Sequence, residues 1–548
     1  MEKTRFKSKK LMLATWACNI KDHYQCIDWI PIFKKIFGKV IVFSLRDNYF
    51  RYGKPAMNQL FLEKVQQEKP DYLYFNTRYD EIDFNTITEI KRVSPHTKTI
   101  YYSCDDEWRY SDWSRFYSPL FDYIIVDEKG TTEHEKDGLR NFYFINGVNP
   151  ERYKPVKAEK KYDVVFIGMP IRDRADYIRF LKKSGVKIKL FGKGWDSYPD
   201  LKDIWGGYLP QEDYLKTISQ ARVNLSFSKG MLKGSERGQI KGRPWETLSC
   251  KSFILIEYFK NIASYFKDYR QISFKDKKEL LEKINYYLKH EKEREKLTEK
   301  FHKIVLEEYS WEVGLKGFFN AIANERKFKP NNFPELNKYI LCLNESDWYL
   351  SDNKLTEKVN KFDYISFSKG SHINNPRKDY LQIYSIEKSG LPISCCDYNL
   401  AFNSREVYAI FQAKKAFNLL NGKDFHKLLN INQFVVKREY LITNIKKFRK
   451  LYAGSETEIV TAKNTTFVSF PLVNLDKIKP LEYSKMKDAF YMTFRDTLYS
   501  FIYNKKRLFS AYPLKIFLSS FSEPFIFQHL FKSIFNKDNW DKLTGRMF

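Results

Sequence analysis

The sequence has few cysteines, and they form no pattern that is typical of a metal site or a disulfide framework. There are seven of them, an odd number, with irregular spacing and mostly apolar neighbours: Cys18, Cys26, Cys104, Cys250, Cys342, Cys395 and Cys396. Scattered thiols of this kind are typical of a reduced intracellular protein. We therefore expect neither disulfide bonds nor a zinc site.

Long apolar segments are also missing. No run of about 18 apolar residues occurs, so we expect no helix that spans a membrane. The basic start of the chain is not followed by the apolar core and cleavage site of a secretory signal. These absences predict a cytoplasmic protein, at most peripheral to the inner face of the cell membrane.

Acidic residues are too few to balance the basic ones. The chain of 548 residues has 95 Lys and Arg against 67 Asp and Glu, a formal net charge of +28. Such a charge favours nucleic acid, an anionic membrane surface or phosphate-bearing substrates as partners, although a biased genome would account for part of it. Nucleic acid is the weaker alternative, because no arginine-rich tract or repeat of base-stacking aromatics is present.

Hydrophobic residues make up 43% of the chain and aromatic residues 17%, which is enough for packed cores in about three domains. In the first part of the chain, short apolar β-rich runs alternate with helical stretches. These runs are residues 11–15, 39–45, 71–76, 98–103, 122–128 and 142–146. Almost wholly apolar strands separated by helices predict a doubly wound parallel sheet.

Residues 161–325 repeat the same alternation, with strands expected at 162–168, 186–195 and 222–228. The sequence therefore predicts an α/β fold with two Rossmann-like halves. Polar loops follow the first and the fourth strand of the first half, and working residues of such sheets lie in loops of this kind.

The segment 222–258 contains an apolar strand, a loop rich in Gly, Lys and Arg, a helix opened by Pro244 and a second apolar strand. Glycines let backbone amides approach a ligand closely, and the start of a helix attracts an anion. Proline suits the first helical position. A diphosphate is the expected ligand, and a solvated basic loop without a ligand is the alternative.

Six motifs occur in a fixed order along residues 8–325. They are YYSCDDEWRYSDWSRFYSPLFDYII, FINGVNPERYKP, KYDVVFIG, FGKGW, VNLSFSKG with KGRPWETLSCKSFILIEYF, and EEYSWEVGLKGFF. With these motifs the chain resembles the CgeB-type (spore-coat maturation-like) GT-B glycosyltransferases. The resemblance implies two facing Rossmann-like domains, an acceptor domain at residues 1–155 and a nucleotide-sugar domain at 156–326.

The activity implied by the resemblance is transfer of a sugar from a nucleotide-sugar donor. The acceptor would be a saccharide, a lipid-linked precursor or a protein, in the synthesis of bacterial surface polysaccharide or glycoconjugate. A GT-fold protein without turnover, which serves as a binding or scaffold subunit, is the alternative.

The resemblance also implies a donor site. Glu246 would accept hydrogen bonds from the ribose hydroxyls, while Lys241 and Arg243 would hold the diphosphate. Further candidates for the diphosphate site are Gly168, Ser228 and Lys229. An acid in the first turn of a helix can also merely complement the helix dipole, which is the alternative role for Glu246.

Departure of the diphosphate requires a metal ion or fixed cations and helix amides. The chain offers the second solution, so we expect no cofactor and no metal in the GT-B part. If the reaction inverts stereochemistry, an acceptor hydroxyl also needs a base. The candidates are Asp105, Asp106 and His23, each of which could instead be a capping or salt-bridged residue.

Residues 327–337 read as a linker, and 338–548 as a third domain that is mixed α/β or mainly helical. Residues 338–368 resemble the middle of a family-two GT-A glycosyltransferase, in which an acidic motif binds a divalent cation. Asp347 is the candidate ligand. The motif departs from the family at Asn344 and Ser346, and the strands that should precede it have no room. A truncated relative, or a structural or acceptor-binding module, is therefore expected.

The segment 504–535 mixes aromatic residues with Lys and Arg. Such a segment can lie on an anionic membrane surface, where both kinds of side chain gain free energy. A helical pair packed on its own domain, interrupted by Pro513 and Pro524, is the alternative.

Overall fold

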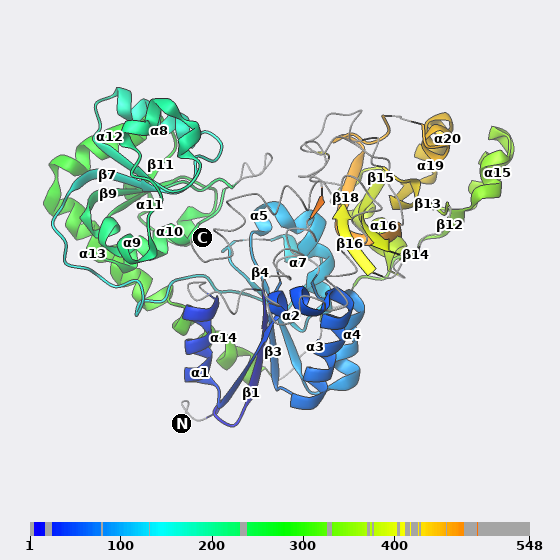
Figure 1. Ribbon diagram of the computed structural model, residues 1–548, viewed down its shortest axis with the longest axis horizontal. Helices are drawn as coiled ribbons and strands as arrows, with labels where there is room; N and C mark the ends of the chain where they lie inside the picture. The colour runs from blue at the N-terminus through cyan, green and yellow to red at the C-terminus, as the bar shows by residue number, and fades with distance from the viewer. Residues whose placement is uncertain are drawn as a thin grey trace.

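In the residues that the computed structural model describes, the chain forms three α/β domains, each built on its own sheet (Figure 1). The described residues are 5–16, 25–77, 81–130, 132–230, 238–325, 331, 333–369, 373–374, 377–402, 406–411, 417, 426, 429–455, 458–475 and 490–491.

The first domain contains a parallel sheet with the strand order β2-β1-β3-β4-β5-β6. Its strands are β1 (Lys10–Thr15), β2 (Lys39–Ser44), β3 (Tyr72–Asn76), β4 (Lys98–Ser103), β5 (Tyr123–Val126) and β6 (Phe142–Phe144). The helices are α1 (Ile30–Ile36), α2 (Leu45–Tyr52), α3 (Lys54–Glu68), α4 (Phe84–Val93), α5 (Asp106–Arg109), α6 (Arg115–Tyr117) and α7 (Glu133–Lys136).

Both faces of this sheet are covered. Leu11 and Leu13 of β1 belong to one hydrophobic cluster, and Met12 and Ala14 belong to the cluster on the opposite face. Successive side chains of a strand point to opposite faces, so an uninterrupted apolar run requires helices on both sides. The doubly wound sheet expected from the apolar runs is thereby confirmed.

The second domain has a parallel sheet with the order β11-β10-β9-β7-β8. Its strands are β7 (Tyr162–Ile167), β8 (Ile188–Phe191), β9 (Ala221–Ser226), β10 (Ile254–Glu257) and β11 (Ser273–Phe274). Its helices are α8 (Arg174–Lys183), α9 (Gln211–Gln220), α10 (Gly242–Ser249), α11 (Tyr269–Ile272), α12 (Lys277–Lys289) and α13 (Glu291–Glu308).

The chain passes between these two domains twice, and the two passages lie side by side. Val148 N–H donates to the carbonyl of Tyr309, and Trp311 N–H donates to the carbonyl of Val148, both at 3.0 Å. The second passage leads into α14 (Trp311–Asn324), which returns to the first domain and packs in the cluster that contains Leu11 and Leu13.

This return corrects the division at residue 326 that was expected from the sequence. An amphipathic helix joins the face that buries its apolar side chains, and Leu315, Phe318 and Phe319 complete the first core and not the second. Structurally, the first domain comprises the chain up to Val148 together with α14.

The third domain is mixed α/β in its described residues. Its strands are β12 (Ile340–Leu343), β13 (Tyr364–Phe367), β14 (Ile373–Asn374), β15 (Ile393–Phe402), β16 (Glu406–Phe411), β17 (Phe434–Lys437), β18 (Thr465–Leu475) and β19 (Phe490–Tyr491). Its helices include α15 (Asp352–Val359), α16 (Lys378–Ser389), α19 (Arg438–Thr443) and α20 (Ile445–Tyr452). Parallel and antiparallel pairs occur in the same sheet.

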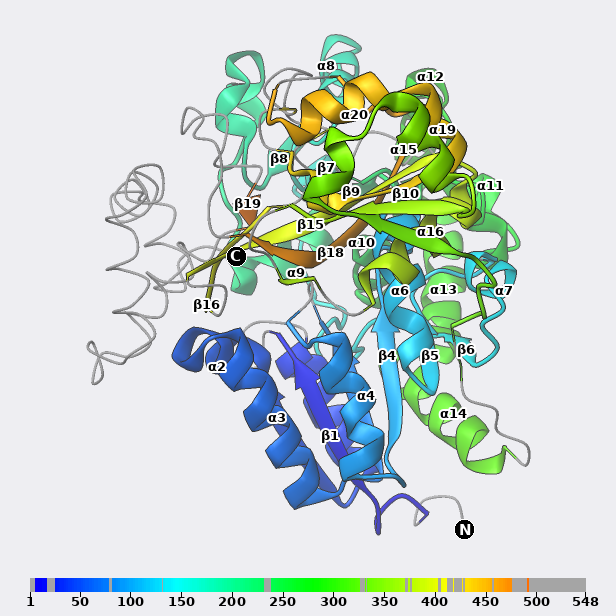
Figure 2. The ribbon, with the colours of Figure 1, turned by 90° about the vertical axis from the view of Figure 1, so that its right-hand side faces the viewer.

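The third domain sits on the first domain, beside α6 and α7 (Figure 2). Lys388 of α16 reaches the buried carboxylate of Asp137, with a distance of 2.9 Å between its Nζ and Oδ1, and Phe116 packs edge-on against Tyr384. These contacts join the two domains into one continuous hydrophobic cluster.

None of the described helices has the length and apolarity that a membrane-spanning helix requires. The segment 504–535, which the sequence suggested for a membrane surface, lies outside the described residues.

Candidate active site

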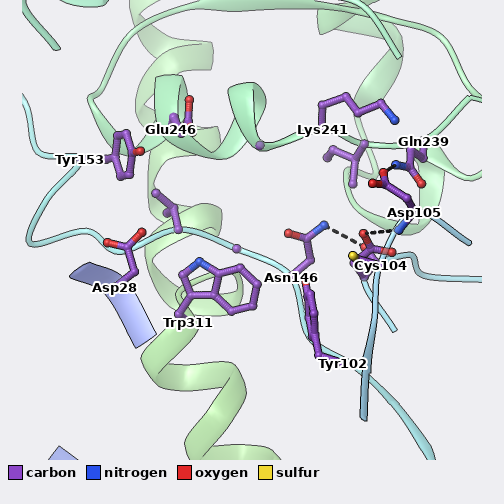
Figure 3. Close-up of a pocket in the computed structure, with 15 residues that line it drawn as sticks. Asp28, Tyr102, Cys104, Asp105, Asn146, Tyr153, Gln239, Lys241, Glu246 and Trp311 are labelled. Atoms are coloured by element: carbon purple, nitrogen blue, oxygen red, sulfur yellow. Dashed lines mark hydrogen bonds between the residues drawn. The ribbon is translucent and has the colours of Figure 1, made fainter. Parts of the chain in front are cut away.

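Two adjoining cavities lie at the carboxyl ends of the strands. The larger, about 560 Å³, is in the second domain, and we call it the second-domain cavity. The smaller, about 260 Å³, lies between the first and second domains, and we call it the cleft (Figure 3). Lys241, Gly242 and Glu246 line both. Ligands of open α/β sheets bind at this edge, so the pair of cavities is the candidate active site.

Helix α10 meets both cavities with its first turn. The helix begins at Gly242, two residues before the expected start at Pro244, and no side chain caps its free N–H groups. Behind it, the ring of Trp245 is fully buried and stacks on Tyr309 with centroids 4.5 Å apart. This packing fixes the helix so that its positive end is available to an anion.

The second-domain cavity is lined by several cations. Arg243 lies over the ring of Tyr214 at 4.9 Å, and its buried Nη1 has no hydrogen-bond partner among the described residues. Arg174 donates to the carbonyls of Met169 and Lys229, and burial lowers the pKa of Arg174 to about 10, so it is charged at neutral pH. Both guanidinium groups can bind phosphate oxygens.

Glu246 lies where the two cavities meet. Its carboxylate accepts a hydrogen bond from the hydroxyl of Tyr214, and Arg243 Nε lies 4.0 Å from its Oε2. Burial, followed by the charge of Glu246, raises the pKa of Tyr214 well above its ordinary value, so the phenol stays a donor. A carboxylate can still accept further O–H donors. Glu246 is therefore placed to bind vicinal hydroxyls.

Gly168 follows β7 and lines the second-domain cavity. A Cβ at this position would lie 2.8 Å from the tip of the Phe166 ring. A larger residue would therefore have to displace that ring, and the contact of Gly168 with a diphosphate stays a prediction.

Ser228 and Lys229 line neither cavity. The N–H and the Oγ of Ser228 donate to Glu257 Oε2 at 2.9 and 3.2 Å, and Lys229 Nζ lies 2.9 Å from Glu257 Oε1. Glu257 is a buried acid at the end of β10, and a buried carboxylate needs such partners. Ser228 and Lys229 thus compensate the buried charge of Glu257, and their expected contact with a phosphate stays a prediction.

Asp105 lines the cleft and has a left-handed backbone, with φ of 59° and ψ of 33°. A residue other than glycine adopts this conformation at a cost of about 1–3 kcal/mol, and such strain clusters at functional sites. Asp105 N–H donates to Asp127 Oδ2 at 3.2 Å, and its Oδ1 accepts from Gln239 of the second domain at 2.7 Å. Burial and then the charge of Asp105 raise the pKa of Asp127 well above its ordinary value.

Asp106, the second predicted base, is not brought to the cleft. Asp106 points into the first domain, where both of its oxygens accept from the hydroxyl of Ser103 and one also accepts from Ser114. It lines neither cavity. The third candidate, His23, lies outside the described residues.

Asp28 is an acid of the cleft that sequence reasoning missed. Its side chain is buried in the π-helical turn Gln25–Trp29, where Asn149 Nδ2 donates to its Oδ1 at 3.2 Å and Arg152 lies 3.5 Å from its Oδ2. Burial raises the pKa of Asp28; Arg152 and Asn149 oppose this rise, and the charge of Glu246 adds to it. The available signal was a single acid in the apolar run CIDWIPIF directly after a polar loop.

Figure 3 shows the arrangement of the cleft. Asp28 and Tyr153 lie at one end and Asp105 and Gln239 at the other. Trp311 and Tyr102 lie between them on the side of the first domain. The cleft thus combines carboxylates, amides and aromatic faces, the groups that bind hydroxylated ligands.

Asp347, the candidate metal ligand of the third domain, is a buried capping residue. Its Oδ2 accepts from Asn344 N–H at 3.0 Å, and its Oδ1 is paired with Lys358. Across the described part of the chain, no group of three or more His, Cys, Asp or Glu side chains is arranged to hold a metal ion.

Comparison with known proteins agrees with this architecture. Residues 172–318 match a family model described as glycosyl transferase-like. Two Rossmann-like domains that face each other across a cleft are the GT-B arrangement. The fold is thus that of the GT-B class, and residues 172–318 are similar to glycosyl transferase-like proteins.

Among curated proteins, the chain is similar to the spore protein CgeB of Bacillus subtilis (strain 168). The two are 21% identical over 272 residues, which cover 45% of this chain and 81% of CgeB. The resemblance to CgeB-type proteins that the motifs indicated is thereby confirmed.

Three solved structures illustrate the structural neighbours. T4 phage BGT in complex with UDP-glucose is 15% identical, with a TM-score of 0.39 over 58% of this chain and 100% of that one. Anabaena Alr3699/HepE in complex with UDP-glucose is 10% identical, with a TM-score of 0.42 over the same shares. The Thermobaculum terrenum O-GlcNAc transferase mutant is 10% identical, with a TM-score of 0.39 over 58% and 67%.

Proposed function

We propose that the protein is a glycosyltransferase that moves a sugar from a nucleotide-sugar donor to an acceptor hydroxyl in the cleft. The observation that carries the proposal is the meeting of a cationic cavity and an acidic cleft at the first turn of α10. Lys241, Gly242 and Glu246 belong to both cavities, so a donor held in one presents its sugar to the other.

On the donor side, the diphosphate would lie against the start of α10, with Lys241, Arg243 and Arg174 around it. Glu246 would accept the ribose hydroxyls. As the bond between sugar and diphosphate breaks, negative charge grows on the leaving oxygen, and fixed cations and backbone N–H groups stabilise that charge in place of a metal. Metal-independent transfer is therefore part of the proposal.

On the acceptor side, Asp28 would act as the general base of an inverting transfer, with Asp105 as the second candidate. A base works best when its pKa approaches the working pH, and burial raises the pKa of Asp28 in that direction. The acceptor proton would pass to Asp28 while the acceptor oxygen bonds to the sugar carbon and the diphosphate leaves.

The acceptor that we propose is a saccharide, free or lipid-linked, in surface polysaccharide or glycoconjugate synthesis in the cytoplasm or at the inner face of the membrane. Trp311, Tyr102 and Tyr153 offer apolar faces to sugar rings, and Asn146 and Gln239 offer amides to their hydroxyls. Such a mixture of aromatic and polar groups suits a neutral polyol.

The first experiment measures binding of UDP, GDP, dTDP and CDP by calorimetry, and hydrolysis or transfer from the corresponding nucleotide sugars. A turnover product identifies an enzyme, whereas binding without turnover favours the scaffold alternative. If neither occurs with any nucleotide, the proposal is wrong.

The second experiment tests the role of Glu246. Hydrogen bonds to a charged group contribute about 1.5–3 kcal/mol, so Glu246→Ala should weaken nucleoside diphosphate binding by about tenfold to a hundredfold. Glu246→Gln is the matched variant, because it keeps the size and one acceptor oxygen but removes the charge. If both variants lower only the melting temperature and leave the affinity unchanged, Glu246 serves the helix dipole and not the ligand.

A further inference from the structure

The start of helix α5 in the first domain and the segment before α10 in the second domain meet beside the cleft. Gly238 N–H of the second domain donates to Glu107 Oε1 of the first at 2.9 Å, and Lys241 Nζ lies 3.6 Å from Glu107 Oε2. The neighbouring pair, Gln239 with Asp105, joins the same two segments. Glu107 therefore contacts the segment that leads into α10 at two points.

The two charged partners differ in exposure. The side chain of Glu107 is 0% exposed, whereas that of Lys241 is 25% exposed and lines both cavities. Glu107 lines neither cavity, so it approaches Lys241 from behind while the ligand space lies in front. In the described part of the chain, the carboxylate of Glu107 has Gly238 as its hydrogen-bond donor and Lys241 as its counter-ion.

A carboxylate that loses all contact with water is retained only where specific partners compensate it. Both partners of Glu107 come from the other domain, so its compensation depends on the position of the 238–241 segment. The reverse also holds: that segment is held where the buried carboxylate places it.

We propose that Glu107 is a positioning residue through which the acceptor domain orients Lys241 for the donor diphosphate. The inference rests on the proposed function, because it assumes that Lys241 binds this group. It adds that a residue of the first domain, without contact to the ligand, sets the affinity of the nucleotide site in the second domain.

The sign of the effect distinguishes positioning from plain electrostatics. A carboxylate repels a diphosphate, so on charge alone its removal would tighten binding. Positioning predicts the opposite, because a lysine side chain carries about 2 kcal/mol of rotamer entropy that the anchor has already removed. If removal of Glu107 returned all of that rotamer freedom to Lys241, diphosphate binding would weaken by roughly thirtyfold, which is the upper limit. We expect binding to weaken by about tenfold.

The experiment titrates UDP, GDP, dTDP and CDP into full-length wild-type protein and variants by calorimetry. Glu107→Gln should bind about tenfold more weakly, and Glu107→Asp, which keeps the charge, should recover part of the loss. Lys241→Met should also weaken binding, and the double variant Glu107→Gln/Lys241→Met should be no weaker than Lys241→Met alone, because coupled residues are not additive.

Glu128→Gln is the matched control. Glu128 is another buried acid of the first domain, and its Oε1 accepts a hydrogen bond from Asn261 of the second domain at 3.0 Å. Its replacement disturbs the same interface but should leave diphosphate affinity unchanged. Melting temperatures of all variants establish that they are folded.

Three results would overturn the inference: equal or tighter binding by Glu107→Gln, an equal loss in Glu128→Gln, or additive losses in the double variant. Absence of diphosphate binding by the wild-type protein is a different result. It would overturn the donor site itself, and the inference with it.

Discussion

Gly147→Ala is expected to loosen the junction at which the chain passes between the first two domains. A Cβ at Gly147 would lie 2.1 Å from the carbonyl oxygen of Tyr309, short of ordinary contact at 3.4 Å by 1.3 Å. The obstacle is backbone, which cannot turn away as a side chain can. The two passages would have to separate, and the hydrogen bonds of Val148 and Trp311 between them would lengthen.

Overpacking of this kind costs about 1–3 kcal/mol, and two weakened hydrogen bonds add about 0.5–1.5 kcal/mol each. For a domain of this size each kcal/mol lowers the melting temperature by about 2–4 °C, so we expect a fall of about 5 °C or more by calorimetry. Nucleotide-sugar turnover should fall with it, because the cleft is bounded by the same junction.

Gly317→Ala is the matched control for this prediction. Gly317 lies in α14, where a Cβ would meet nothing within 4 Å, and alanine in a helix is favoured over glycine by about 0.5–1 kcal/mol. This variant should melt at the wild-type temperature or slightly above it. Wild-type stability of Gly147→Ala, or an equal fall in both variants, would refute the reasoning.

Further predictions concern the chemistry and the third domain. The proposed base must be deprotonated, and burial raises the pKa of Asp28, so kcat/KM should fall as the pH drops, with a midpoint above that of an exposed carboxyl group. Asp28→Asn should lower kcat by about a hundredfold or more. A pH profile of kcat/KM that is flat down to about pH 4 would contradict the role of Asp28 as the base. Transfer should continue in EDTA, and a complete loss that added Mg²⁺ or Mn²⁺ restores would show that a metal is required. Lys388→Ala removes one cation from the buried carboxylate of Asp137, so it should lower the urea midpoint of unfolding. Lys338→Ala is the control and should lower it less, because the ion pair of Lys338 with Glu387 is more exposed. Equal midpoints would contradict a role of Lys388 in joining the third domain to the first.

The sequence predicted the two Rossmann-like sheets because the information is local. A strand buried on both faces is mostly apolar along its length, and the stretches at 11–14 and 100–102 show this without reference to the rest of the chain. The return of α14 was not predictable in this way. Its apolar stripe fits either core, and only the tertiary structure shows which face it covers.

The same difference between local and long-range information applies to the candidate site. Lys241, Arg243 and Glu246 follow one another on a single loop and helix, so their grouping could be predicted from sequence. The roles of Asp28 and Glu107 could not be predicted in this way, because each contacts a residue more than a hundred positions away in the sequence.

Ser228 and Lys229 show what the residue type alone leaves open. They have the residue types of an anion site, yet their positions are explained by Glu257, an acid inside an apolar strand whose need for partners the sequence does not display. Residue type alone therefore does not separate a ligand contact from the compensation of a buried charge.

The paired passages at Val148 and Ser310 have a topological consequence. The second domain is an insertion in the first, because the chain leaves the first domain and re-enters it at adjacent points. The inserted unit is therefore exchangeable as a cassette, since its two ends meet and the first domain closes its own core with α14. Under the proposed function, such an exchange would change the donor preference in one step and keep the acceptor side, provided that the incoming cassette presents a partner to Glu107.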